Sequence, residues 1–162
     1  MKIKILTFVI LFYFSNELFC QSFTLTELIR INNFKFEEFD SYVIKKGYSF
    51  YKYDDKTISK DARTYFYSNN NKEYITVCYF DNKEQSTTLQ TKNSSTYLKT
   101  KEDLKILEYK FIENKVENGS IILVYKKNDI SVKLISMPEK DENHNSFTFY
   151  IISVKKILYK EN

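Results

Sequence analysis

One stretch of the chain decides the fold: Phe36-Glu37-Glu38-Phe39-Asp40-Ser41-Tyr42-Val43-Ile44-Lys45-Lys46-Gly47-Tyr48-Ser49-Phe50. Within it a helical pattern turns into an extended one. The apolar stripe of the helical part consists of Phe36, Phe39, Tyr42 and Val43. Gly47 follows where a helix commonly ends on a left-handed residue. The sequence therefore predicts a helix over about residues 34–46 that passes directly into a strand over residues 48–53.

The same pattern returns 61 residues later. A helix is expected from Ser94 to about Leu107, and it leads directly into a strand that starts at Tyr109. The matching pairs are Phe36 with Tyr97, Val43 with Leu104, Tyr48 with Tyr109, and Phe50 with Phe111. This offset predicts two similar units of about residues 21–92 and 93–162. Chance similarity of two α+β stretches is the alternative.

Further elements surround these two stretches. Thr24 and Glu27 form a capping-box pattern that predicts a short first helix. The remaining extended runs, separated by turn residues such as Asn118-Gly119, are 63–68, 73–80, 86–91, 120–126, 130–136 and 147–154. The polar segment 137–145 is expected to connect the last two strands as a hairpin.

The predicted fold class is α+β, with two tandem helix-then-antiparallel-sheet units whose sheet packs on the helices. Alternation within the run 130–136 supports this, because Ile130, Val132 and Leu134 are separated by Ser131 and Lys133, which leaves one sheet face in water. A single domain over residues 21–162 is expected, since that length can bury a sufficient core.

The first twenty residues have the three-part layout of a secretory signal peptide. A short positive segment with Lys2 and Lys4 precedes an apolar run over residues 5–14, which is about half the length that crosses a membrane. A more polar exit ends at Cys20, after which cleavage is predicted. An N-terminal buried strand or helix is one alternative. Another is an outer-membrane lipoprotein with Cys20 as its first residue, but that requires a small residue where Phe19 stands. The sequence therefore predicts an exported protein, periplasmic or secreted, whose mature chain has no transmembrane segment.

Composition excludes several classes of protein. The 162 residues include 14 Phe and 14 Tyr, too much apolar area for a disordered chain, and only 2 Cys, too few for a disulfide scaffold. The net charge of +4 comes from lysine, with only 2 Arg in the chain. Lysine here accompanies Asn, Ile and Tyr, a bias typical of AT-rich coding sequence. Nucleic-acid readers favour Arg, so no nucleic-acid partner is expected.

Few residues carry catalytic chemistry. His144 is the only histidine and lies in the polar segment, so one general base at most is available for Cys or Ser nucleophiles. Cys78 lies in an apolar run and is interpreted as a small buried residue. No glycine motif for phosphate and no zinc-ligand spacing occurs in the sequence. No catalytic residues, metal or cofactor are therefore predicted, although the absence of enzymatic activity stays an expectation.

Tyrosine is the most distinctive candidate for a binding surface. Tyr51 and Tyr53 are expected on one side of a strand, and Tyr65 and Tyr67 on one side of the next. Paired across a hairpin, the four would form an aromatic patch, a surface type that is enriched in binding sites. The alternative is that tyrosine is present only because it forms strands well.

The sequence also resembles known proteins. The leader ending in Phe19-Cys20-Gln21-Ser22, the Lys/Asn/Ile/Tyr bias, and the segment from Phe39 to Phe50 resemble short uncharacterised exported proteins of Bacteroidetes-type bacteria. The two-unit layout looks like the β-lactamase-inhibitor-protein architecture, and this implies the layout alone.

Two functional hypotheses follow from the sequence. The first is a non-enzymatic exported protein that binds a protein or cell-envelope component through an aromatic sheet face. The alternative is a small periplasmic hydrolase or a ligand-binding pocket protein. The oligomeric state is left open.

Overall fold

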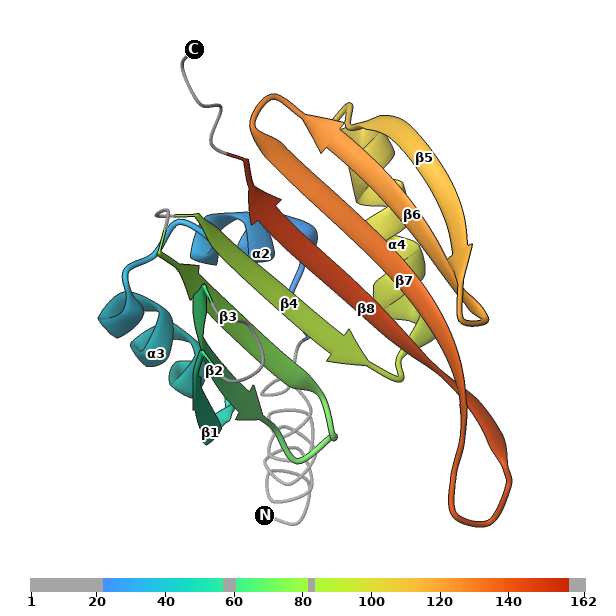
Figure 1. The fold of residues 1–162 in the computed structure, drawn as a ribbon, viewed down its shortest axis with the longest axis horizontal. Helices are drawn as coiled ribbons and strands as arrows, with labels where there is room; N and C mark the ends of the chain where they lie inside the picture. Colours follow the sequence, from blue (N-terminus) through green and yellow to red (C-terminus); the bar gives the residue numbers. More distant parts are fainter. Residues whose placement is uncertain (1–21, 57–60, 82–83, 158–162) are drawn as a thin grey trace, which may run out of the picture.

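The computed structural model describes residues 22–56, 61–81 and 84–157, so the predicted signal peptide lies outside the described residues. In these ranges the chain forms three helices and one antiparallel sheet of eight strands (Figure 1). The predicted α+β class is therefore confirmed.

Side chains cap the first turn of the first and of the third of these helices. Helix α2 (Leu25–Ile31) has the predicted capping box, in which the Thr24 hydroxyl accepts from the Glu27 N–H and the Glu27 carboxylate accepts from the Thr24 N–H. Helix α3 (Phe36–Lys45) lies within the predicted range. Helix α4 (Ser94–Ile106) is capped by the Asn93 side chain, which accepts from the Ser95 N–H.

The strands follow the two groups of helices. After α3 come β1 (Ser49–Asp55), β2 (Ala62–Ser68), β3 (Tyr74–Phe80) and β4 (Gln85–Thr91). After α4 come β5 (Lys110–Glu117), β6 (Ser120–Lys127), β7 (Ile130–Lys140) and β8 (Ser146–Lys156). The order across the sheet is β1-β2-β3-β4-β8-β7-β6-β5, so β1 and β5 are the two edges and β4 pairs with β8 at the centre.

The hairpin of β7 and β8 is longer than the sequence predicts. The polar segment 137–145 was expected to be a connection, but β7 continues to Lys140 and pairs with β8 from Ser146. Strand β6 stops opposite Ser136, so among the described residues Pro138 has no neighbouring strand on the β6 side. Proline lacks an N–H group, and at this position no hydrogen bond to β6 is lost. The hairpin thus projects beyond the rest of the sheet (Figure 1).

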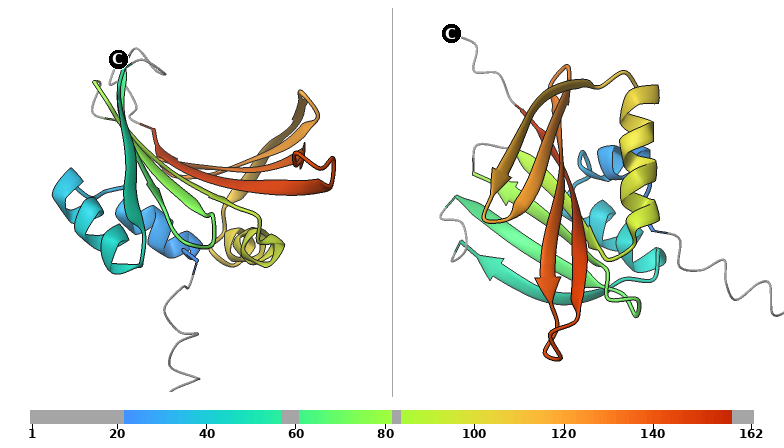
Figure 2. Two further views of the ribbon diagram at one scale, coloured as in Figure 1. Left: turned by 90° about the horizontal axis from the view of Figure 1, so that it is seen from below. Right: turned by 90° about the vertical axis from the view of Figure 1, so that its right-hand side faces the viewer.

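All three helices pack on one face of the sheet, and the other face is open to solvent among the described residues. Figure 2 shows the sheet curling away from the helices at both ends, so that the open face is concave. The core between helices and sheet contains Leu25, Leu28, Phe39, Val43, Tyr67, Ile75, Val77, Leu89, Leu104, Val132, Leu134, Ile152 and Val154. Leu98 of α4 is 56% exposed and is not part of this core.

The two junctions between helix and first strand have the same backbone geometry. The Tyr48 N–H donates to the Val43 carbonyl at 3.1 Å, and the Tyr109 N–H donates to the Leu104 carbonyl at 2.8 Å. The residue before each tyrosine is left-handed, with φ of 87° at Gly47 and 57° at Glu108. Each first strand also has a register shift, after Phe50 in β1 and after Phe111 in β5.

Candidate functional site

The open face is the face of the sheet that the described helices leave uncovered. Side chains alternate between the two faces of a strand, so the residues next to buried Ile75, Leu89, Val132 and Ile152 belong to the open face. The pairings of neighbouring strands align these residues in rows that cross the sheet. Three such rows form the floor and walls of the concave surface.

The middle row is rich in hydroxyl groups, and we call it the hydroxyl row. At the centre of the sheet the Thr88 hydroxyl donates to the Ser153 hydroxyl at 3.1 Å, so the pair joins β4 to β8 by side chains as well as by backbone. Thr76 and Lys133 flank this pair. The full row is Lys52, Phe66, Thr76, Thr88, Ser153, Lys133, Val124 and Glu113.

On one side of the hydroxyl row lies an apolar row, formed by Tyr74, Gln90, Ile151, Ile135 and Ile122. These side chains are half-buried by their neighbours on the sheet and reach solvent only through the open face. Met137 and Phe149 pair next along β7 and β8, and they extend the apolar surface onto the projecting hairpin. Contact area of this kind favours binding of a partner with its own apolar side chains.

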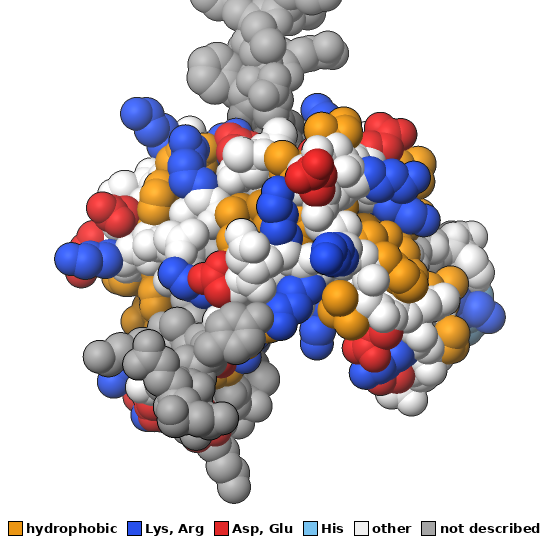
Figure 3. Space-filling model, turned by 90° about the horizontal axis from the view of Figure 1, so that it is seen from above, with side chains coloured by type: hydrophobic (Ala, Val, Ile, Leu, Met, Phe, Trp, Pro, Cys, Tyr) orange, Lys and Arg blue, Asp and Glu red, His pale blue; other side chains and the backbone are white. Residues whose placement is uncertain are grey.

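On the other side lies a row with more charge, which we call the basic row: Asp54, Thr64, Cys78, Ser86, Lys155, Ser131, Lys126 and Lys110. The Lys155 ammonium pairs with the Glu84 carboxylate at 2.7 Å and lies 4.9 Å from the centre of the Phe80 ring. Figure 3 shows lysines, carboxylates and apolar side chains interspersed at this end of the molecule. The open face therefore offers mixed polar and apolar contacts rather than one strong charge.

Two of the four predicted tyrosines are brought together. Tyr53 and Tyr65 are direct partners in the β1–β2 register, with ring centres 4.8 Å apart. They lie on the helix side, because the Tyr65 ring also packs against Phe36 of α3 at 4.2 Å. Tyr67 is a core residue: it is fully buried, and its hydroxyl donates to Asp40 at 2.6 Å. Burial and this hydrogen bond raise the pKa of Tyr67 well above its usual range.

Tyr51 lies on the other face, so the expectation that it shares a side with Tyr53 is wrong. The β1–β2 register moves from Phe50 opposite Tyr67 to Lys52 opposite Phe66, which makes Tyr51 the extra residue of a β-bulge. Its ring contacts Tyr74 of the open face, with centres 6.3 Å apart. The four tyrosines therefore do not form one patch, and their role in binding stays a prediction.

Cys78 has the character of a packed residue rather than a nucleophile. It is half-buried in the basic row, and its sulfur lies 3.4 Å from the Thr64 hydroxyl. Burial raises the pKa of the Cys78 thiol, and this outweighs the opposite effect of Thr64. His144 is at the tip of the β7–β8 hairpin, whereas Cys78 is in β3.

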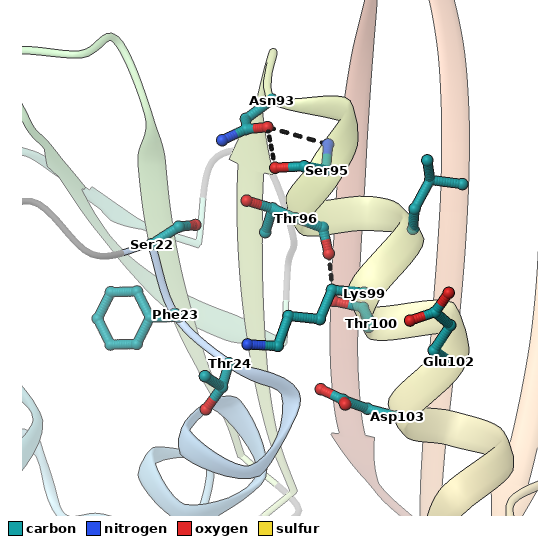
Figure 4. Close-up of a pocket in the computed structure, with 11 residues that line it drawn as sticks. Ser22, Phe23, Thr24, Asn93, Ser95, Thr96, Lys99, Thr100, Glu102 and Asp103 are labelled. Carbon is teal, nitrogen blue, oxygen red and sulfur yellow. Dashed lines mark hydrogen bonds between the residues drawn. The ribbon is translucent and has the colours of Figure 1, made fainter.

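A cavity of about 650 Å³ lies on the helix side, between α4 and the segment that enters α2. Figure 4 shows Lys99 extending from α4 toward Thr24, with Asp103 one turn further along the helix. Ser22 and Phe23 form the opposite wall. This is the polar cavity on which a small-molecule site would depend.

Sequence reasoning missed the apolar row. Ile135 follows directly after Leu134 and Ile122 after Ile121, so these side chains interrupt a simple apolar–polar alternation. That departure was the available signal, because a strand with apolar residues on both faces has a second face to cover. What the sequence alone could not supply was the strand order that places Ile122, Ile135 and Ile151 side by side.

Among the described residues, no group of three or more His, Cys, Asp or Glu side chains could hold a metal ion. In the same part of the chain, no helix combines the length and the apolar character needed to cross a membrane. The chain matches no family model, no curated protein and no solved structure.

Proposed function

We propose that this is a non-enzymatic exported protein that binds a protein partner through the open face of its sheet. The observation that carries the proposal is the concave face itself, with an apolar row beside a hydroxyl row and no helix over it (Figure 2). Interfaces combine an apolar centre with polar groups around it, and the rows supply both.

The shape of the face favours a protein over a flat surface. A convex partner can reach the Thr88–Ser153 pair at the floor of the sheet, whereas a planar membrane would touch only the edges β1 and β5. A cell-envelope component with a protruding segment would fit in the same way. Tyr51 and Phe149 would contribute aromatic contacts from opposite parts of the face.

We also infer that the chain consists of two tandem units, each a helix followed by four strands. The 61-residue offset is supported by the matching junctions, in which Gly47 corresponds to Glu108 and Val43 to Leu104. It is supported further by register shifts at Tyr51 and Ile112, which are also 61 residues apart. The resemblance in layout to the β-lactamase-inhibitor-protein architecture agrees with this arrangement.

The proposal that the protein is exported depends on the predicted signal peptide in the first twenty residues. Mass analysis of the protein from its host would test it, with a mature chain that begins at Gln21 as the expected result. A chain that retains residues 1–20, or one lipidated at Cys20, would contradict the proposed processing.

Binding through the open face is testable by matched charge reversals. Lys133→Glu changes an exposed side chain on the open face, and Lys105→Glu makes the same change on α4. Affinity capture from the host envelope is expected to lose its specific partner with the first variant and keep it with the second. Equal recovery with both variants would contradict the proposal, provided that both melt like the wild type.

A ligand-binding pocket is the second candidate, favoured by the cavity beside Lys99 and Asp103. Native mass spectrometry of the protein from its host would show a bound small molecule if this candidate is right. Loss of that molecule in Lys99→Glu, with retention in Lys133→Glu, would support the pocket over the open face.

A further inference from the structure

The uncovered apolar surface is unevenly divided between the two ends of the sheet. Of the ten large apolar side chains that are exposed in the described part of the chain, six lie in α4, β5 and β6. They are Leu98, Ile106, Phe111, Ile112, Val116 and Ile121. Val116 is 71% exposed and Ile112 is 54% exposed, both on the edge strand β5. Val116 pairs with Ile121 of β6, so exposed apolar side chains continue from the edge strand to its neighbour.

Among the described residues, strand β5 is also an edge strand, with one side of its backbone left unpaired by the sheet. It pairs with β6 along one side, and it is the last strand in the order of the sheet (Figure 1). Its register with β6 is regular from Glu113 to Glu117, after the shift that follows Phe111. Outward N–H and C=O groups along such a run are a template for a further antiparallel strand.

The sequence of β5 is complementary to itself. In an antiparallel pair of identical strands related by a two-fold axis, one residue faces its own copy. With Asn114 at that position, Glu113 faces Lys115 of the second copy, and Lys115 faces Glu113 of the second copy. This register lies within the regular part of β5, which runs from Glu113 to Glu117. Opposite charges in directly facing positions stabilise a strand pair.

We propose that two copies of this chain associate edge to edge through β5, in the antiparallel register centred on Asn114, and so form one continuous sheet across the dimer. The interface is isologous, because the same strand serves both partners. It uses a different surface from the centre of the open face, so this inference goes beyond the proposed function.

Charge reversals in β5 give a direct test. Glu113→Lys places lysine opposite Lys115, and Lys115→Glu places glutamate opposite Glu113, so each variant repels its own copy. A mixture of the two variants restores opposite charges at all four facing positions. The Glu113–Lys115 contact within one strand joins two side chains that are about half exposed, so either change is expected to have little effect on the fold.

The measurement is sedimentation velocity of the protein purified from its host after expression from the full sequence, over a broad concentration series. The wild type is expected to reach the dimer mass, each single variant to remain at the monomer mass, and their mixture to recover the dimer. Lys52→Glu, on the opposite edge β1, is the matched control and is expected to dimerise like the wild type. Melting temperatures close to the wild-type value show that the variants are folded.

A wild type that stays monomeric throughout, or a dimer that both single variants retain, would overturn the proposal. A mixture that fails to recover the dimer would overturn the proposed register. A monomeric wild type that still loses its envelope partner on Lys133→Glu would overturn the dimer alone and leave the proposed function standing.

Discussion

Tyr48 and Tyr109 have the same place in the two halves of the molecule, since each follows a helix and donates its N–H to that helix's last turn. Their surroundings differ. The Tyr48 hydroxyl donates at 2.9 Å to the carboxylate of Glu73, a buried residue just before β3. The Thr91 hydroxyl, at the end of β4, donates to the same carboxylate at 2.6 Å. The first half is thus closed by a buried hydrogen-bonded carboxylate.

The second half has different residues at the equivalent positions. Ile130, at the start of β7, takes the place of Glu73, and Lys156, at the end of β8, takes the place of Thr91. The place beside Tyr109 is a cavity of about 280 Å³, lined in part by Leu107 and Ile130. This half also carries most of the exposed apolar side chains. The two halves therefore share a backbone geometry but differ in their side chains. Buried hydrogen bonds stabilise the first half, whereas the second half leaves apolar surface available for a partner.

Removal of the buried carboxylate should be the most damaging change. Glu73→Ala leaves the Tyr48 and Thr91 hydroxyls buried without their acceptor, which lowers the free energy of unfolding by about 3 kcal/mol. Ile130→Ala, at the matching place, removes a half-buried apolar side chain and costs about 1 kcal/mol. Urea unfolding of both variants measures the two losses. Equal losses would show that the halves do not differ in the way described.

Substitutions of the left-handed residues before the two tyrosines should change the free energy of unfolding in opposite directions. Gly47→Ala places a Cβ at a φ of 87° and is expected to lower the free energy of unfolding by about 1 kcal/mol. Glu108→Gly relieves the same strain at a φ of 57° and is expected to raise it by about 0.5 kcal/mol. Thermal unfolding checks both changes. A stabilising Gly47→Ala would contradict the equivalence of the junctions.

Acid should weaken the contact between α2 and α3, because Glu27 of α2 pairs with Lys46 at 2.6 Å and accepts from the Tyr42 hydroxyl at 2.9 Å. Burial tends to raise the pKa of Glu27, but hydrogen bonds from Lys46, the Thr24 backbone and Tyr42 outweigh it and lower the pKa from 4.5 to about 2. The stabilisation is therefore fully present above pH 4.5 and is lost as the pH falls toward 2.

Since Glu27 is partly exposed, the loss should be no more than about 1 kcal/mol. Unfolding measured between pH 6 and pH 2 is expected to show a shallower pH dependence in Glu27→Gln than in the wild type, by about this amount. The same slope in both proteins would show that the contacts of Glu27 with Lys46 and Tyr42 do not couple α2 to the rest of the first half.

Local patterns in the sequence predicted most of the helices and strands of this fold. The capping box at Thr24, the helix that ends before Gly47 and the alternation from Ile130 to Leu134 all depend on neighbours in the chain, and the structure contains each of them. The predicted leader and the export that depends on it lie outside the described residues.

Features that depend on pairing between strands could not be predicted in the same way. The bulge that turns Tyr51 to the open face is a property of the β1–β2 register, and the sequence of β1 alone does not predict it. The length of the β7–β8 hairpin was missed because Pro138 and its polar neighbours resemble a loop, although they pair beyond the end of β6. The candidate site was found only in part, since Tyr67 proved to be core and the apolar row required the strand order.

Site-specific photocrosslinking in the native host tests the central claim most directly. A photoreactive amino acid replaces Lys133 on the open face in one strain and Lys105 on α4 in another. The open face as the binding surface predicts a discrete protein adduct from position 133 and none from position 105. An adduct from position 105 with none from position 133 would contradict it.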